Sequence, residues 1–368
     1  MKLDAKVWKV GLGSVAAVAK KTALCEGGDL VRLFPVDGGI ELLCTNGSAE
    51  ARRVLPVDGQ LDRQIHVHAA PLLEFIGKAP ATHVDLRVSE GSIRITYHGS
   101  SMQVSIVDAE LPEMAGDPQG SVEVPPELLV TAIKAVRYVA SNDPADAALH
   151  GVEVAVGDRI IRTRAGSREG RIAECVAGDG NPASLRPALI SPSSADHVVA
   201  AAMKAESVNV AIGDGVMRMN TPGGLSLLCR TFDRRMHDLG AMLDVTTGEC
   251  GAVVAVAGVQ GALDRISAVA GPSDAVSMGM SGGQMTFSVE SVAGVTGKAS
   301  SQCPVESGRN WSTGILIAHR LLSSTMRAMS GRVKISFDSD ITLGHVVRVE
   351  PIDEQVVTRI GLARMRAM

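Results

Sequence analysis

The sequence is poor in aromatic residues: five phenylalanines, two tryptophans and two tyrosines stand among 368 residues. A core of this composition is aliphatic and filled with methionine rather than with stacked rings. No apolar run approaches the ~20 residues that a membrane-spanning helix needs. The opening MKLDAKVWKV also lacks the continuous apolar stretch of a secretory signal. We therefore expect a cytoplasmic protein with no membrane partner.

Paired cysteines and an excess of positive charge are lacking too. The six cysteines stand at positions 25, 44, 175, 229, 250 and 303, and none form a C-x-x-C pair. This scatter favours reduced thiols over a disulfide framework or a zinc site. The net charge is −4, whereas a DNA-binding domain is usually basic. The charge argues against a tight general grip on nucleic acid, but it allows a protein whose basic residues line one inner surface.

Short strand patterns that recur along the chain are abundant. Three of them end in an apolar residue followed by aspartate, and the aspartates are 125 and 120 residues apart: Val107-Asp108, Phe232-Asp233 and Ile352-Asp353. Two series of hairpin patterns, with alternating apolar residues on both sides of a turn, recur at similar spacing. They cover 30–44, 151–163 and 275–289, with turn glycines Gly38, Gly157 and Gly282, and then 84–96, 208–219 and 333–343.

A helical pattern precedes each of these strand groups, at 5–24, 70–80, 126–140, 193–205, 255–270 and 318–330. Pro125-Pro126 and Ser193-Ser194 are residue types that begin helices. The chain thus predicts an α+β fold of six helix-plus-antiparallel-sheet units, paired into three domains. Recurrence on this scale indicates an array. We place the domains at 1–120, 121–245 and 246–368.

Three stretches are similar to a known family: LLEFIGKAPATHVDLRVSEGSIRI (72–95), VSIVDAELPEM (104–114) and GLSLLCRTFDRRMHDLGAMLD (224–244). The ordered set resembles the bacterial DNA polymerase III β subunit, the sliding clamp, over essentially the whole chain at low identity. Asp233 and Asp238 match the two aspartates of a motif of that family. The resemblance implies a head-to-tail homodimer whose three-domain chains close a ring, with helices lining the hole.

Basic residues recur on the six predicted helices. Lys6, Lys9, Gly13 and Lys20 have the spacing of one helix face. By themselves such residues are typical of any solvated helix. The resemblance implies that they contact the phosphates of double-stranded DNA without reading its sequence. The expected DNA contacts are Lys6, Lys9, Lys20, Lys21, Lys78, Lys134, Arg137, Lys204, Arg265, Arg320 and Arg327. The tyrosines that the family has near DAALHGV (146–152) are not seen.

The family also has an apolar pocket between its second and third domains, which takes a short linear peptide from a DNA polymerase, the clamp loader and repair proteins. The matching residues here are Leu149, Arg164, Gly166, Ser167, Arg168, Glu169, His237, Met242, Leu362, Arg364 and Met365. Ser167 replaces a histidine and Glu169 a leucine. Because apolar anchors need apolar walls, the substitutions predict a pocket that is weakened or changed in specificity.

Other motifs favour no catalytic chemistry. GLGSVA (11–16) is similar to a dinucleotide fingerprint, but no strand pattern precedes it, which argues against an oxidoreductase. His66 and His68 share a strand face without further metal ligands nearby, so an exposed strand is favoured over a metal site. No nucleophile, base and acid are placed together by the sequence. We expect no enzyme activity, no cofactor and no metal.

The sequence therefore predicts a DNA sliding clamp, a processivity factor that encircles duplex DNA and tethers the replicative polymerase and other partners during replication and repair. The alternative is a specialised clamp paralogue that acts mainly as a protein-interaction scaffold, with an altered peptide pocket. Binding of a standard clamp-binding peptide distinguishes the two.

Overall fold

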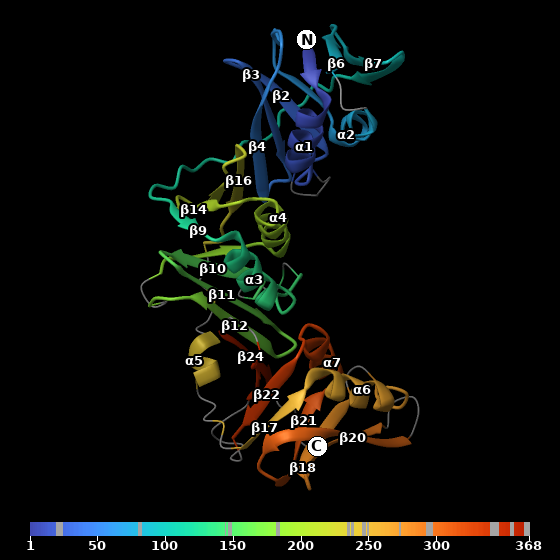
Figure 1. Ribbon diagram of the computed structural model, residues 1–368, viewed down its shortest axis with the longest axis vertical. Helices are drawn as coiled ribbons and strands as arrows, with labels where there is room; N and C mark the ends of the chain where they lie inside the picture. Colours follow the sequence, from blue (N-terminus) through green and yellow to red (C-terminus); the bar gives the residue numbers. More distant parts are fainter. Residues whose placement is uncertain are drawn as a thin grey trace. The chain divides into compact units, whose positions relative to one another are not determined.

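The chain divides into two compact units by its internal contacts. Unit 1 comprises Met1–Val130 and Arg186–Asp233, and unit 2 comprises Thr131–Leu185 and Arg234–Met368. The elements are shown in the computed structural model of Figure 1. The structure describes residues 1–19, 25–79, 83–143, 145, 149–181, 185–233, 236, 239–244, 248, 250–271, 274–291, 297–338, 346–353 and 357–363.

Unit 1 contains two antiparallel sheets. The smaller has the order β1-β6-β7-β8 and the larger the order β5-β2-β3-β4-β16-β15-β14-β9. The strands are β1 (Lys2–Asp4), β2 (Leu30–Val36), β3 (Gly39–Thr45), β4 (Ala49–Pro56), β5 (Ile65–His68), β6 (His83–Val88), β7 (Ser92–Tyr97), β8 (Ser100–Ser105), β9 (Val122–Val124), β14 (Val208–Gly213), β15 (Val216–Asn220) and β16 (Leu225–Arg230). A further strand of the unit, β13 (Pro187–Ile190), forms a bridge from Ile190 to Thr231.

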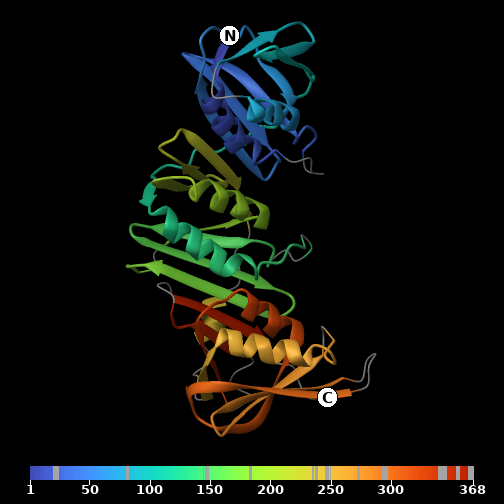
Figure 2. The same cartoon turned by 45° about the vertical axis from the view of Figure 1, so that its right-hand side comes forward.

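The helices of unit 1 are α1 (Ala5–Ala16), α2 (Ala69–Lys78) and α4 (Pro192–Ala202). In Figures 1 and 2, α1 and α2 lie side by side, and α1 also contacts β4. α4 begins at Pro192 because the hydroxyl of Ser191 accepts a hydrogen bond from the Ser194 amide at 3.0 Å. The helix start that we predicted at Ser193-Ser194 is therefore one residue late.

Unit 2 has one long antiparallel sheet, in the order β10-β11-β12-β24-β23-β22-β17-β20-β19-β18-β21. Its strands are β10 (Val152–Gly157), β11 (Ile160–Ser167), β12 (Arg171–Gly178), β17 (Cys250–Ala255), β18 (Ala275–Ser281), β19 (Gln284–Ser291), β20 (Gly297–Gly308), β21 (Trp311–Ala318), β22 (Arg332–Phe337), β23 (Val346–Pro351) and β24 (Val357–Ala363). The register from β12 to β24 runs from Arg171 opposite Leu362 to Val176 opposite Val357.

The helices of unit 2 are α5 (Leu239–Asp244), α6 (Val256–Ile266) and α7 (His319–Arg327), and α3 (Pro126–Arg137) passes from unit 1 into unit 2. α6 and α7 are in contact, as Figure 2 shows. Near them, the ring of Trp311 packs edge-on against Phe337 at 5.0 Å between centroids. Aliphatic side chains form most of the rest of the core, as the composition predicts.

The predicted α+β class and the repeated order of helices and strands are confirmed. All six predicted helices are present, although α1 ends at Ala16 rather than at Leu24, and α5 was not predicted. The second strand of the hairpin predicted at 333–343 lies mainly outside the described residues. The domain boundaries at 120 and 245 remain a prediction, because the contacts define two units.

The apolar–Asp segments make equivalent backbone contacts in the first two repeats. The amides of Ile106 and Val107 donate to Gly91 and His66 at 2.9 Å. One repeat later, the amide of Thr231 donates to Gly215 at 2.9 Å, and that of Phe232 to Leu189 at 2.8 Å. The third segment differs: Ile352 donates to Arg332 of β22 at 3.0 Å, and the Asp353 carboxylate accepts from the same arginine at 2.6 Å. Each apolar–Asp segment thus lies directly after a strand, although the backbone contacts of the third differ from those of the first two.

Two of the three predicted turn glycines adopt the backbone conformation that glycine favours. Gly38 has φ +76° and Gly282 has φ +58°, both in the left-handed region. In the middle hairpin that conformation belongs to Arg159, with φ +59°, and not to Gly157. A Cβ atom on Gly157 would lie 2.4 Å from the Leu185 side chain, so this glycine makes room for a leucine.

The segment between β8 and β9 has no helix or strand, but it is fixed to the large sheet of unit 1. Glu113 pairs with Arg32 of β2, and the Met114 amide donates to the buried carboxylate of Glu50 at 2.9 Å. Asp117 pairs with Arg218 of β15 at 2.5 Å. These contacts hold the segment along the sheet.

We expect Glu113→Gln to reduce stability at neutral pH but not in acid. The hydrogen bond from Arg32, and then its charge, lower the pKa of Glu113. A lowered carboxyl pKa contributes stability above the unfolded value of about 4.3 and loses it as the pH falls through the folded value. Because the side chain is 53% exposed, the loss at pH 7 should be below about 1 kcal/mol. Thermal unfolding at a series of pH values measures it, and a difference that stays constant into acid would contradict the assignment.

Candidate nucleic-acid and peptide-binding surfaces

Helix α1 presents basic residues because its other face is buried. Asp4 caps the helix by accepting a hydrogen bond from the Val7 amide at 3.0 Å. Trp8 and Leu12 are fully buried, which leaves Lys6 and Lys9 exposed. α1 ends before Lys20, so the helix face that we predicted does not reach that residue, and Lys20 and Lys21 lie outside the described residues.

The lysines of α1 and α2 differ in their contacts. Lys9 donates to the Gly77 carbonyl of α2 at 2.9 Å, near the negative end of that helix. Lys78 pairs with Glu74, one turn away, at 2.6 Å. Lys6 makes no hydrogen bond or ion pair with any described residue, so its ammonium group can pair with an anion from outside the protein. Lys204, just beyond the end of α4, is likewise exposed and has no ion pair in the described part of the chain.

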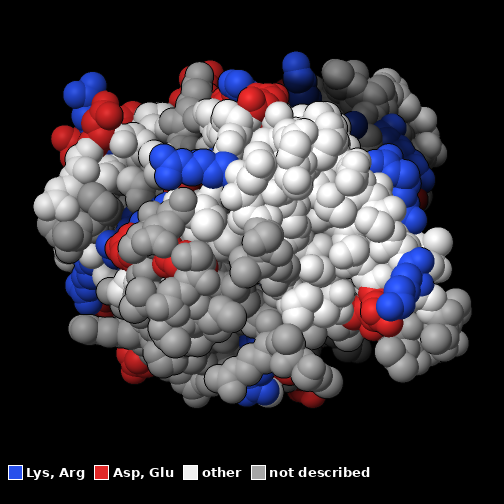
Figure 3. Space-filling view, turned by 90° about the horizontal axis from the view of Figure 1, so that it is seen from below, with Lys and Arg blue, Asp and Glu red and all other residues white. Residues whose placement is uncertain are grey.

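The basic residues of unit 2 lie close to polar groups of the protein. Arg265 of α6 donates to the Ser301 hydroxyl at 2.7 Å and to the Gln302 carbonyl at 3.1 Å, both in β20. Arg327 of α7 pairs with Asp264 of α6 at 3.5 Å. On α3, Lys134 is exposed and Arg137 half-buried. Figure 3 shows lysine and arginine side chains in separate groups on one face, several beside acidic ones.

Arg320 of α7 and Glu169 form an ion pair, although we had assigned them to different sites. Glu169 follows β11 and pairs with both Arg320 and Arg171, the latter at 3.3 Å. Arg171 also donates to the Ser324 hydroxyl of α7 at 3.0 Å. The acid expected in the peptide pocket therefore joins the turn after β11 to α7. Its partners are these two arginines rather than the neighbouring Arg168, which donates to the Ala145 carbonyl at 3.3 Å.

Several of the predicted peptide-pocket residues meet around Gly166. A Cβ atom at this position would lie 2.9 Å from the Leu149 side chain and 3.5 Å from Leu239 of α5, so glycine lets both leucines pack on β11. Ser167 is buried, and its hydroxyl has no hydrogen-bond partner in the described structure. Met242 of α5 is 47% exposed. Leu149 therefore packs on Gly166 of β11, and Met242 lies on α5, a helix that contacts β11.

Two other predicted pocket residues are placed differently. Leu362 is fully buried in β24. Its neighbour Gly361 faces α5, since a Cβ atom there would lie 2.9 Å from Leu243. Arg164 takes part in a row of charges across the sheet, in which the acids are buried and the arginines partly buried. His237, Arg364 and Met365 lie outside the described residues.

The row of charges runs across four strands of unit 2. Glu153 of β10, Arg164 of β11, Glu174 of β12 and Arg359 of β24 are direct cross-strand partners. Arg164 Nε donates to Glu174 at 2.7 Å, and Arg359 pairs with Glu174 and with Asp244 of α5. Both glutamates are nearly fully buried. The row fixes the orientation of Arg164, whose planar guanidinium suits such pairing.

Within the described residues, no group of three or more His, Cys, Asp or Glu side chains could hold a metal ion. His66 pairs with Gln64 at 3.2 Å and His68 with Asp29 at 3.2 Å. Burial, and then the charge of Arg32, lower the pKa of His66. No described helix is both long and apolar enough to cross a membrane.

No protein-family model matches the chain, and no curated protein matches its sequence. Solved structures do match it over its full length. The DNA polymerase III β subunit of Thermotoga maritima matches with a TM-score of 0.86 at 15% identity, covering 100% of this chain and 99% of the other. The chain has the fold of the DNA polymerase III β subunit. A DNA polymerase sliding clamp from Pseudomonas aeruginosa matches equally well at 17% identity, with the same coverage of both chains. The β chain from Streptococcus pneumoniae has a TM-score of 0.84 at 15% identity, again with 100% and 99% of the two chains covered.

Within this clamp fold, sequence reasoning missed α5 and the residues that pack beneath it. Leu239 and Leu243 of α5 contact Gly166 and Gly361 of the sheet. A helix of six residues carries too little periodicity to be recognised in a sequence. A signal was nonetheless present, because glycine within a strand often marks the close approach of another element.

Proposed function

We propose that the protein is a DNA sliding clamp that encircles duplex DNA as a head-to-tail homodimer and tethers a DNA polymerase and other proteins. One observation carries the proposal: the clamp fold extends over the full length of the chain. A closed ring of this kind needs no catalytic site, and we propose that the protein has none. The scaffold alternative finds no support in the comparisons.

The distribution of basic residues is compatible with sliding. We propose that Lys6, Lys9, Lys78, Lys204 and the bases of α3, α6 and α7 face the DNA, together with Lys20 and Lys21. Exposed ion pairs such as Lys78–Glu74 and Arg327–Asp264 are screened by water and contribute little to stability. DNA phosphates therefore compete for these cations at little cost. Contacts of this type read no sequence and weaken with salt.

We propose that partner proteins dock a short peptide beside Gly166, Leu149 and Met242. Ser167, Arg168 and Glu169 flank this surface, and Arg164, His237, Leu362, Arg364 and Met365 complete the predicted set. Because Glu169 already pairs with Arg320 and Arg171, an apolar anchor nearby meets a neutralised acid rather than an isolated one. Binding an aliphatic side chain there then costs less free energy than the substitution of leucine by Glu169 alone predicts.

Encirclement is tested by the shape of the DNA. The protein is loaded onto a nicked circular plasmid with the clamp loader of the same organism, and gel filtration separates bound from free protein. We expect co-elution with the circle and release after a single cut, because a ring slides off a free end. Equal retention on cut and uncut plasmid would show side-on binding and contradict the proposal.

Lys6 and Lys204, which have no ion pair with a described residue, test the surface that we propose to face the DNA. Lys6→Glu combined with Lys204→Glu should shorten retention on the circle by about tenfold or more, and more strongly at low salt. Lys298→Glu is the matched charge reversal outside the helices, on β20, and should leave retention unchanged. Equal losses for both would mean that only net charge matters.

A further inference from the structure

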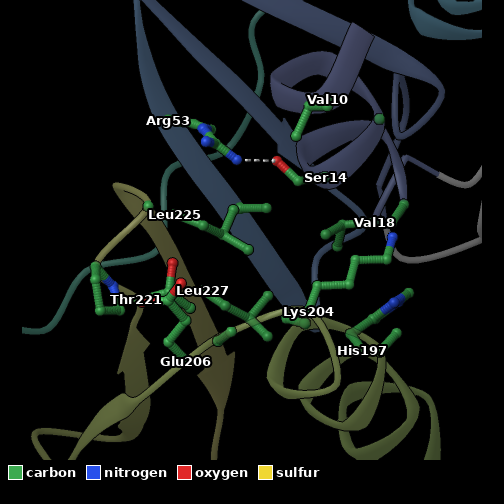
Figure 4. A pocket seen from close by; sticks show the side chains of 18 of the residues that line it. Val10, Ser14, Val18, Arg53, His197, Lys204, Glu206, Thr221, Leu225 and Leu227 are labelled. Atoms are coloured by element: carbon green, nitrogen blue, oxygen red, sulfur yellow. Dashed lines mark hydrogen bonds between the residues drawn. The ribbon is translucent and has the colours of Figure 1, made fainter. Parts of the chain in front are cut away.

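A groove of about 750 Å³ lies within unit 1, between α1 and α4, with β4 and β16 as its floor. Figure 4 shows the side chains that line it: Val10 and Ser14 of α1, Arg53 of β4, Leu225 and Leu227 of β16, and His197 of α4. The groove is separate from the peptide surface described above, which belongs to unit 2. Its volume is in the range of small-ligand and peptide pockets.

The floor and one wall of the groove are apolar. Leu225 and Leu227 form the floor, and Val10 is 58% exposed although its side chain is aliphatic. A surface that faces only DNA phosphates gains nothing from an exposed valine, because phosphates and water are its neighbours. Val10 extends the apolar surface of the floor onto the exposed side of α1.

The groove also contains Arg53, an arginine whose described partner is a hydroxyl group and not a carboxylate. Arg53 is half-buried, and its guanidinium donates to the Ser14 hydroxyl at 3.3 Å. The Ser14 hydroxyl in turn donates to the Gly11 carbonyl at 2.6 Å. Arg53 makes no ion pair with any described carboxylate, and burial lowers its pKa. The adjacent Arg52 pairs with Glu50 at 2.5 Å and with Glu113 at 3.6 Å.

Other charges in the groove reinforce its positive character. Lys9 and Lys204 line it, and Glu206 is the one carboxylate among the lining residues that the structure describes. A desolvated guanidinium without an anion costs free energy that a bound carboxylate recovers. The groove therefore combines an aliphatic surface with a site for negative charge.

We propose that this groove docks a short segment of a partner protein that carries aliphatic side chains and at least one carboxylate. The aliphatic side chain covers Val10, Leu225 and Leu227, and the carboxylate pairs with Arg53. Single-stranded nucleic acid fits less well, because His197 is the one aromatic ring among the described lining residues and successive bases need several stacking platforms. The inference goes beyond the proposed clamp function, with which it shares only Lys9 and Lys204.

The probe is an octapeptide of alternating glutamate and leucine with a fluorescein label, titrated against the full-length protein by fluorescence anisotropy. Arg53→Gln should weaken binding by about tenfold or more, since a charge-assisted hydrogen bond is lost. Val10→Ser should weaken it by several fold. Lys298→Gln, a charge removal on β20 outside the groove, is the control and should have no effect. Unchanged melting temperatures establish that the variants are folded.

Three results of the peptide titrations would overturn the proposal. They are no binding to the wild type, binding that Arg53→Gln leaves unchanged, and equal binding of a peptide with glutamine in place of glutamate. Displacement of the peptide by a single-stranded oligonucleotide whose own binding depends on Arg53 but not on Val10 would assign the groove to nucleic acid instead. Arg53 and Val10 are not among the proposed DNA contacts. Retention on circular DNA therefore tests the clamp function independently of this groove.

Discussion

Glu174→Ala should lower the free energy of unfolding of unit 2 by about 3–5 kcal/mol, as expected when one member of a buried ion pair is removed. Glu174 is 4% exposed and lies between Arg164 and Arg359 in the cross-strand row. Its loss leaves both partly buried guanidinium groups beside a methyl group. Each keeps one further acid, Glu153 for Arg164 and Asp244 for Arg359, so the row is weakened at its centre and not abolished.

The two tryptophans allow this effect to be assigned to one unit. Trp8 lies in unit 1, and Trp311 packs against Phe337 in unit 2. In a Trp8→Phe background, tryptophan fluorescence during denaturant unfolding therefore reports on unit 2. Glu290→Ala is the matched control, because Glu290 opposes Lys298 on neighbouring strands at 2.7 Å but is 63% exposed. It should cost less than about 1 kcal/mol. Similar losses for the two variants would mean that water screens the row.

Gly178→Ala is the second substitution with a large expected cost, about 3 kcal/mol. Gly178, at the end of β12, has φ +87°, which costs a residue with a Cβ atom about 1–2 kcal/mol. The added Cβ would also lie 2.0 Å from the Arg159 carbonyl oxygen, and a backbone atom cannot rotate away. Moving the Arg159 turn adds about 1–3 kcal/mol.

Gly38→Ala separates these two contributions. Gly38 has a similar φ of +76°, but a Cβ atom there meets nothing within 4 Å. We expect only the conformational cost, about 1–2 kcal/mol. Denaturant unfolding of both variants gives the comparison, with Trp8 reporting on unit 1 and Trp311 on unit 2. If the two costs were equal, the close approach at Arg159 would be of no consequence.

The local pattern of the sequence was sufficient to predict the six longer helices of the described chain and most hairpins. Alternation and helical spacing depend on neighbouring residues, and α4 or the hairpin at 30–44 could be placed to within a few residues. The role of Gly157 could not be predicted in this way. Its hydrogen atom leaves space for Leu185, which is 28 positions later, and no turn rule contains that contact.

The partners of the candidate site residues are even more distant in sequence. Glu169 and Arg320 pair across 151 positions, and their spacing carries no signal of that contact. The basic residues of the helices could be found from the sequence, but their ion pairs could not. The prediction that Glu169 weakens an apolar pocket was incomplete for the same reason, because the sequence did not show its two arginine partners.

The pairing of β12 with β24 has a consequence for the order in which the molecule is made. Glu174 and its partner Arg359 are separated by 185 residues. A growing chain therefore exposes the free edge of β12 until nearly all of unit 2 has been synthesised. Such long-range pairing slows folding and leaves an open strand edge on which other chains can aggregate. Glu174 stands on that edge strand, next to Arg164 of β11, and until β24 covers it the carboxylate keeps the edge polar and disfavours pairing with the wrong strand.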